Sequence, residues 1–184
     1  MSSEAIEGIL RHNREFVEKG EYGRYVTDKY PDKRIAIVTC MDTRLVELLP
    51  AALGIKNGDA KIIKNAGAVI SSPFDSAMRS LLVAVYELKV NEIMIIGHTD
   101  CGVQGMDAAE MKHLMEERGI PHERIELLER SGIDLDSWLS GFSDTRLSVL
   151  ASVDMVRNHP LMPADVSVSG YIMDSVTGAL SPAD

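Results

Sequence analysis

The segment at residues 93–102, IMIIGHTDCG, constrains the fold and chemistry of this chain more than any other. An apolar, β-branched run ends at Gly97, which is typical of a buried strand closed by a glycine. His98 and Cys101 follow at once. In an open α/β sheet, ligands bind just beyond the carboxyl ends of strands, and we expect these two side chains there. An imidazole and a thiol three residues apart form half of a zinc site.

Cys40 offers the second thiol. It ends another apolar run, residues 35–38, and so has the same position relative to its own strand. If the two strands are neighbours in a parallel sheet, Cys40, His98 and Cys101 meet at one edge. Two thiolates and one imidazole make a three-ligand zinc set that leaves the fourth tetrahedral position open, as in catalytic sites. The 184-residue chain has no other cysteine, and we therefore predict one zinc ion per chain.

Composition and charge limit the other kinds of function. The net charge of −9 at pH 7 argues against a nucleic-acid partner, whose phosphates need clustered Lys and Arg. We see no apolar run long enough to cross a membrane and no signal-peptide core near the N-terminus. Two cysteines do not make a disulfide framework, which favours a reducing compartment. We expect a cytoplasmic protein without nucleic-acid or membrane partners.

The order of elements predicts an α/β fold, with a central, mostly parallel β-sheet flanked by helices and a short edge strand at the C-terminus. Strands are expected near residues 34–40, 61–63, 93–97 and 166–173, with the edge strand after residue 178. Helices are expected near residues 4–17, 45–53, 72–88, 107–119, 121–130 and 147–156. Ser72 is expected to cap the helix that begins there, with Pro73 at its first position.

The length predicts one domain, residues 1–184, with a polar helical insertion at roughly residues 103–142. The histidines outside the zinc set lie among charged residues, and we interpret them as solvated: His12, His113, His122 and His159.

Three segments in this order resemble the β-class carbonic anhydrases: Cys40-x-Asp42-x-Arg44, then KNAGA at 64–68, then GHTDCG at 97–102. The spacing is similar from about residue 34 to 102, and residues 170–180 resemble the last strand and turn of that family. The resemblance implies a zinc-dependent lyase that hydrates carbon dioxide reversibly to bicarbonate and a proton, by attack of zinc-bound hydroxide. It also implies a homodimer or higher homo-oligomer, as in the compact prokaryotic members. The apolar stripe near Ile6 would pack on the partner.

Asp42 and Arg44 lie two apart in one loop and can pair. We interpret both as catalytic: Asp42 would accept the hydroxide proton and orient it, while Arg44 keeps Asp42 ionised and in place. The resemblance also implies a resting form with Asp42 on the zinc, so Asp42 belongs with the metal residues as well. The alternative interpretation of such a pair is a surface ion pair of little energetic worth. Small residues that let backbone approach the substrate are assigned to the substrate pocket: Asn65, Ala66, Gly67 and Gly102.

Two other functions stay open. A carbonyl sulfide or carbon disulfide hydrolase would keep the same fold and ligands, and pocket and access would decide between the substrates. A non-catalytic structural zinc module, of a different class, would use Asp42 as a permanent fourth ligand and so close the site. A thiol-redox module is disfavoured because the cysteines do not form a Cys-x-x-Cys pair.

Overall fold

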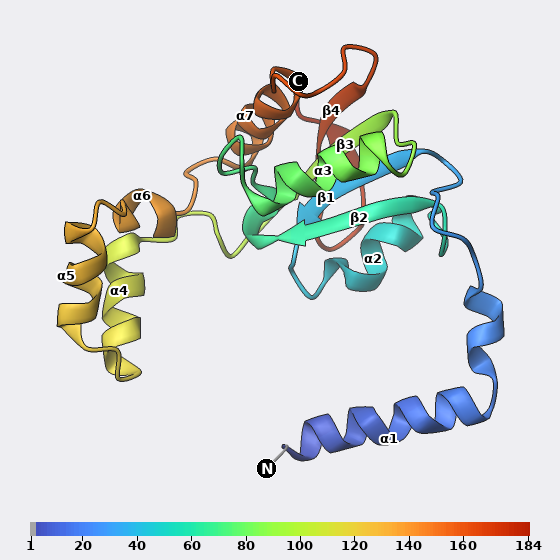
Figure 1. Cartoon of the computed structure of the whole chain (residues 1–184), viewed down its shortest axis with the longest axis horizontal. Helices are drawn as coiled ribbons and strands as arrows, with labels where there is room; N and C mark the ends of the chain where they lie inside the picture. The colour runs from blue at the N-terminus through green and yellow to red at the C-terminus, as the bar shows by residue number, and fades with distance from the viewer. Residues whose placement is uncertain (1–2) are drawn as a thin grey trace.

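One five-stranded sheet, in the order β2-β1-β3-β4-β5, forms the body of the molecule in this computed structural model, which describes residues 3–184 (Figure 1). The strands are β1 (Ile35–Cys40), β2 (Ala60–Asn65), β3 (Glu92–His98), β4 (Ser167–Met173) and β5 (Leu180–Pro182). The first four are parallel to their neighbours, and β5 pairs antiparallel with β4. The predicted mostly parallel sheet and its short C-terminal edge strand are confirmed.

The helices follow the predicted order, with one addition. They are α1 (Glu4–Glu18), α2 (Leu45–Ala52), α3 (Ser76–Tyr86), α4 (Ala108–Glu117), α5 (His122–Arg130), α6 (Leu135–Leu139) and α7 (Thr145–Arg157), with short 3-10 turns η1 (Glu21–Tyr25) and η2 (Ala66–Ala68). Helix α6 was not predicted, because five residues are too short to show a helical period.

The core has two parts, one on each face of the sheet. Helices α3 and α7 cover one face through residues such as Leu81 and Val153, while α2 covers the other through Leu45 and Leu49. Strand β1 is buried on both faces, and its Ile37 is fully inaccessible. Strands covered on both faces read as continuous apolar runs, which explains why the sequence pattern located β1 and β3 so clearly.

Helix α3 begins later than predicted. Asp75, not Ser72, is its N-cap, and the carboxylate accepts a hydrogen bond from the Met78 N–H at 2.7 Å. A carboxylate at this position satisfies a free N–H group and also faces the positive end of the helix dipole, so it is preferred over the serine. The helix ends at Tyr86 rather than at Leu88.

The interpretation of His159 as a solvated residue was wrong. Its side chain is buried, with 4% of its surface exposed. Its Nε2 donates to the carbonyl oxygen of Pro73 at 2.9 Å, while its Nδ1 accepts from the Leu161 N–H at 3.1 Å. A histidine that satisfies two backbone groups in this way can be buried without a charge, which its charged sequence neighbours did not indicate.

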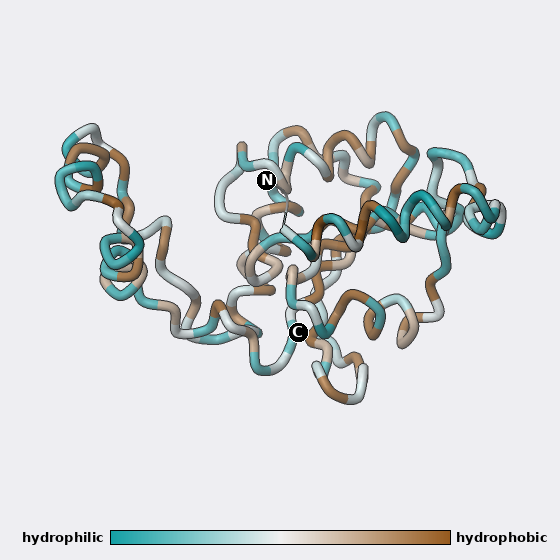
Figure 2. Tube along the Cα trace, turned by 90° about the horizontal axis from the view of Figure 1, so that it is seen from below, coloured by the Kyte–Doolittle hydropathy of each residue, from teal (hydrophilic) through white to brown (hydrophobic). Residues whose placement is uncertain are grey.

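Two segments project from the sheet body on either side (Figure 1). One is α1, where apolar and polar residues alternate along the helix (Figure 2) and none of residues 4–18 is buried. The other contains α4, α5 and α6, which pack around a small core of their own that includes Ile125 and Leu135. Two backbone hydrogen bonds join the segments entering and leaving it, Gly105 N to Phe142 O and Gly141 N to Met106 O. Within residues 3–184, no helix combines the length and apolar character needed to cross a membrane.

Candidate metal centre

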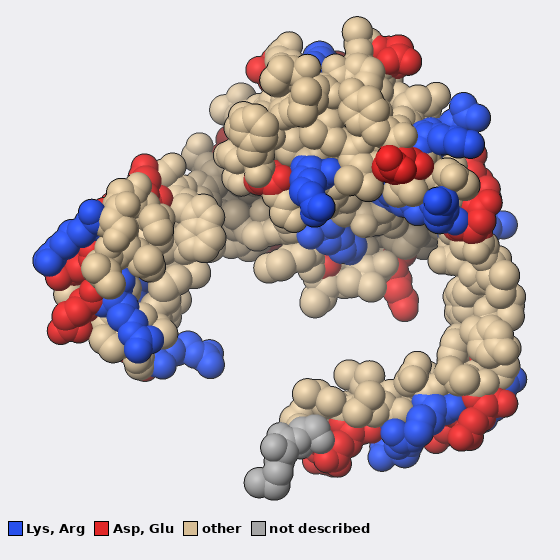
Figure 3. All heavy atoms as spheres, viewed as in Figure 1, with Lys and Arg blue, Asp and Glu red and all other residues tan. Residues whose placement is uncertain are grey.

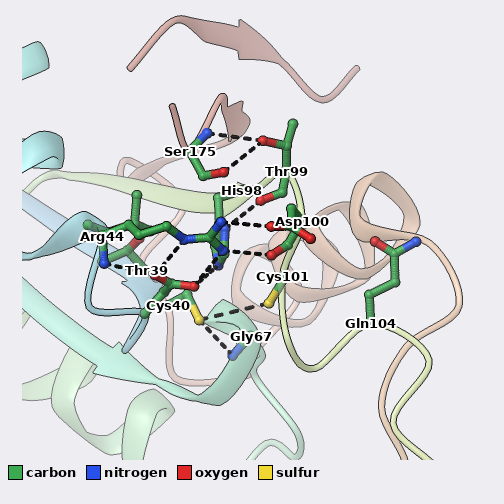
Figure 4. Close-up of polar contacts among 12 residues, drawn as sticks. Thr39, Cys40, Arg44, Gly67, His98, Thr99, Asp100, Cys101, Gln104 and Ser175 are labelled. Carbon is green, nitrogen blue, oxygen red and sulfur yellow. Dashed lines mark hydrogen bonds and ion pairs between the residues drawn. The ribbon is translucent and has the colours of Figure 1, made fainter. Parts of the chain in front are cut away.

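Parallel pairing of β1 and β3 brings the predicted zinc ligands together. Thr39 of β1 lies opposite Ile96 of β3, so the ends of both strands reach the same edge of the sheet. The ligand atoms of Cys40, His98 and Cys101 all lie within 4.8 Å of one another (Figure 4). The two sulfur atoms are 3.9 Å apart. The three residues that sequence reasoning placed at one point are therefore adjacent in the structure.

The hydrogen bonds of His98 leave one ring nitrogen available for a metal. Its Nδ1 is 2.8 Å from the carbonyl oxygen of Thr99, which can only accept, so Nδ1 carries the proton. Nε2 then has a free lone pair. It is buried, and no hydrogen-bond partner for it exists among residues 3–184. A buried polar atom without a partner is destabilising, and a metal ion at Nε2 would satisfy it.

The two thiols have different environments. Burial raises the pKa of Cys40, but the neighbouring His98 side chain and hydrogen bonds from the Gly67 and Asp42 backbone lower it, and the result is a pKa of about 7. The Gly67 N–H is 3.4 Å from the Cys40 sulfur. Burial raises the pKa of Cys101. A bound cation would favour the thiolate form of both residues, because the thiolate is the metal ligand.

The donor set fits zinc. Two sulfurs and one imidazole nitrogen are the ligands of a Cys₂His site, in which three protein ligands leave the fourth position open. All three side chains are nearly inaccessible to solvent. The Asp42 carboxylate lies beside this cluster, with Oδ2 at 3.9 Å from the His98 Nε2.

Asp42 and Arg44 form the predicted pair. Arg44 Nε donates to Asp42 Oδ1 at 3.0 Å, and Nη2 donates to Oδ2 at 2.8 Å. The Arg44 backbone N–H also donates to Oδ1, at 2.8 Å. The hydrogen bonds from the Arg44 side chain lower the pKa of Asp42 to about 2, and the pKa of Arg44 is raised in turn. The carboxylate is therefore ionised at every physiological pH.

Asp100 completes the environment of Arg44, and sequence reasoning missed it. Arg44 Nη1 donates to Asp100 Oδ2, and Nη2 donates to the Asp100 carbonyl oxygen, both at 2.7 Å (Figure 4). The available signal was the place of Asp100 in the loop between His98 and Cys101. Only the pairing of β1 with β3 brings this loop to Arg44, which lies 56 positions away in the sequence.

Sequence reasoning also missed residues that hold the ligand loops. The Thr39 hydroxyl donates to the Ile96 carbonyl oxygen at 3.1 Å and so links β1 to β3. Thr99 Oγ1 accepts from the Ser175 N–H at 3.0 Å and lies 3.2 Å from the Ser175 hydroxyl (Figure 4). These bonds fasten the loop after His98 to the segment after β4.

The four small residues assigned to the substrate pocket lie in different surroundings. The side-chain amide of Asn65 donates through Nδ2 to the Val69 carbonyl oxygen and accepts through Oδ1 from the Val69 N–H, and so closes the turn. With Ala66, Asn65 lines a cleft of about 1050 Å³ between the sheet body and α6. Gly67 has φ of +82°, and a Cβ there would lie 2.8 Å from the Phe142 ring. Gly102 follows Cys101, with no atom near the position of a Cβ.

Known proteins resemble this chain in sequence and in structure. The family model described as carbonic anhydrase matches residues 35–180, which include both ligand-bearing strands. YvdA of Bacillus subtilis, a candidate carbonic anhydrase, is 50% identical over 176 residues, covering 96% of this chain and 89% of YvdA. The crystal structure of β-carbonic anhydrase isoform I from Trichomonas vaginalis superposes with a TM-score of 0.88 at 36% identity, covering 100% of this chain and 98% of that one. A carbon disulfide hydrolase of Acidithiobacillus thiooxidans is 32% identical over 160 residues, covering 82% of this chain and 77% of the hydrolase.

Proposed function

Because this chain belongs to the β-class carbonic anhydrase family, we propose that it hydrates carbon dioxide reversibly to bicarbonate and a proton at one zinc ion held by Cys40, His98 and Cys101. The observation that carries the zinc assignment is the buried His98 Nε2, which has no partner in residues 3–184 and faces two sulfurs. Zinc bound there would lower the pKa of a coordinated water to about 7 and supply hydroxide at neutral pH.

Asp42 and Arg44 prepare this site for the reaction. Asp42 stays ionised because Arg44 holds it with two side-chain hydrogen bonds, and it offers a hydrogen-bond acceptor beside the ligand cluster. The same carboxylate is able to ligate a metal ion. We propose that Asp42 alternates between a resting setting on the metal and an open setting on Arg44. The hydrogen bonds from Arg44 to Asp42 support the open setting.

The test is stopped-flow hydration of carbon dioxide by protein of measured zinc content, with carbonyl sulfide and carbon disulfide assayed in parallel. Rapid hydration that requires zinc is the expected result. No hydration by fully zinc-loaded protein would contradict the proposal. Hydrolysis of carbon disulfide without hydration of carbon dioxide would favour the second candidate function, for which the 32% identity to a carbon disulfide hydrolase is the supporting observation.

A structural zinc module is the less favoured alternative. Such a site needs four permanent ligands, whereas Asp42 is engaged by Arg44 and the metal cluster contains three residues. Zinc content without any hydrolytic or hydration activity would support the structural role.

We further propose that the protein is a homodimer or a higher homo-oligomer. Helix α1 stands away from the sheet body, and Ile6 and Ile9 are 50% and 68% exposed. Uncharged atoms gather on the side of α1 that faces the gap between the two projections, and charged residues gather on the other side (Figure 3). A second copy in that gap would cover this apolar surface.

Sedimentation at micromolar concentration tests the oligomeric state. We expect at least a dimer, which Ile9→Gln should weaken, while Arg11→Gln on the same helix should not. A monomeric parent protein would contradict the proposal.

The remaining assignments concern the whole chain. We propose a cytoplasmic location, because the two thiols needed as ligands persist in a reducing compartment. We also propose that residues 1–184 act as one domain, with residues 103–142 as an insertion, since paired backbone segments join the insertion directly to the loop after Cys101.

A further inference from the structure

The guanidinium of Arg44 links two loops at the edge of the metal centre. One loop follows β1 and carries Asp42. The other lies between His98 and Cys101 and carries Asp100. Nε and Nη2 donate to the Asp42 carboxylate. Nη1 and Nη2 donate to the side chain and the carbonyl oxygen of Asp100 (Figure 4), so every nitrogen of the guanidinium donates. A planar fork held on two sides has little freedom to rotate.

The backbone of Asp100 is adapted to this contact. Its φ is +54°, in the left-handed region that residues other than glycine rarely adopt, although Asp and Asn tolerate it best. In this conformation the carboxylate and the carbonyl oxygen of one residue both reach Arg44. Unfavourable backbone conformations persist where the surrounding contacts hold them, often at functional sites.

The exposure of the three side chains separates their roles. Asp42 is 16% exposed, Arg44 is 39% exposed and Asp100 is 85% exposed. The charge of Asp100 is therefore well screened by solvent, and its main contribution is directional. A side chain exposed to this extent contributes little to packing, and its hydrogen bond goes to Arg44.

We propose that Asp100 is a positioning residue for Arg44: it holds the guanidinium in the plane in which Asp42 binds, and it remains the partner of Arg44 when Asp42 turns to the metal. This inference rests on the proposed two settings of Asp42. Asp100 keeps the Arg44 side chain ordered in both settings. The Arg44 side chain therefore does not lose conformational entropy each time it pairs with Asp42. Asp100 therefore favours the open setting.

Two substitutions at position 100 separate the hydrogen bond of the side chain from its charge. Asp100→Gly removes the side chain, and glycine adopts the left-handed conformation without strain. Asp100→Asn keeps that conformation and the oxygen that accepts from Nη1, but it removes the charge. Asp136→Asn is the control, because Asp136 accepts from Lys112 at the same 2.7 Å, is 73% exposed and belongs to the projecting helices.

The first measurement is independent of activity. In NMR spectra of zinc-loaded protein, the two Nη groups of Arg44 should give separate signals in the parent, in Asp100→Asn and in the control. In Asp100→Gly the two signals should broaden, because Nη1 loses its bond and the guanidinium rotates faster, although Asp42 and the carbonyl oxygen of residue 100 still bind Nε and Nη2. Signals in Asp100→Gly as sharp as those of the parent would overturn the proposal.

The second measurement is the pH dependence of carbon dioxide hydration. In Asp100→Gly the midpoint of the activity rise should move upward by about 0.2 to 0.7 pH unit, which is roughly a 1.5- to fivefold change in the ratio of the two settings. Asp100→Asn and the control should stay within about 0.2 unit of the parent, since a screened charge contributes little. An unchanged or lowered midpoint in Asp100→Gly would overturn the proposal. A parent without hydration activity would instead refute the proposed function, and the NMR result would still decide whether Asp100 holds Arg44.

Discussion

Replacing Arg44 by alanine should move the activity of this enzyme to higher pH. Arg44 is the partner of Asp42 in the open setting, with two side-chain hydrogen bonds at 3.0 and 2.8 Å. Without Arg44, the setting with Asp42 on the metal becomes more favourable relative to the open setting. Hydroxide competes with the carboxylate, and its concentration rises with pH, so the open setting should then be reached only at higher pH.

The structure sets the size of this shift. Arg44 lowers the pKa of Asp42 from 3.8 to about 2, which corresponds to roughly 2 kcal/mol at most. Arg44 is 39% exposed, and solvent screening reduces the contribution of the pair to about 1 kcal/mol. A loss of about 1 kcal/mol is a roughly fivefold change in the ratio of the settings and a midpoint shift of about 0.7 pH unit.

The assay is stopped-flow carbon dioxide hydration from about pH 6.5 to 9.5, on variants whose zinc content is measured first. Lys112→Ala is the matched control, because Lys112 also bonds two carboxylates, at 3.0 and 2.7 Å, and lies in the projecting helices. It should keep the parental pH profile. If Arg44→Ala shows the parental rate and midpoint, Arg44 is only a surface partner and the two-setting scheme is incorrect.

Three further substitutions test the ligand set, a helix cap and the core. Cys101→Ala should lose zinc and hydration activity together, by metal analysis and stopped-flow assay, and full zinc occupancy would refute its role as a ligand. Burial raises the pKa of Asp75, but backbone and hydroxyl hydrogen bonds lower it below 3.8 overall, so its charge stabilises the fold above pH 3.8 and this contribution is lost as the pH falls further. Asp75→Asn should lower the free energy of unfolding in urea by about 1 kcal/mol at pH 7, and a difference that persists undiminished at pH 2 would contradict this account. A Cβ at Gly97 would lie 2.7 Å from Val149, so Gly97→Ala should lower the free energy of unfolding by about 1 to 3 kcal/mol. Gly102→Ala, which meets no atom within 4 Å, should have an unfolding free energy close to that of the parent.

The sequence alone determined most of the elements and the cluster of Cys40, His98 and Cys101. Continuous apolar runs located β1 and β3 because strands covered on both faces exclude polar residues. His98 and Cys101 are three positions apart in one loop, and Cys40 holds the same place after its own strand. Since neighbouring parallel strands end at one edge of a sheet, these local patterns were sufficient to predict the three-residue cluster.

The sequence pattern was less informative where several acceptors compete for one group. Ser72 and Asp75 both suit a helix N-terminus, and the choice of Asp75 depends on the hydrogen bonds that the folded turn allows. His159 has charged neighbours in sequence, yet it is buried between two backbone segments that come together only in the fold. The composition of a local segment does not indicate which distant segments it contacts in the fold.

Only the tertiary structure decided the surroundings of the metal cluster. The contact between Arg44 and Asp100 joins residues 56 positions apart, and it depends on the register of β1 against β3 and on the left-handed backbone at Asp100. The free Nε2 of His98 likewise follows from the position of the Thr99 carbonyl oxygen. The residue types of the cluster follow from local patterns in the sequence. The direction of a side chain depends on contacts between distant segments, which exist only after the chain has folded.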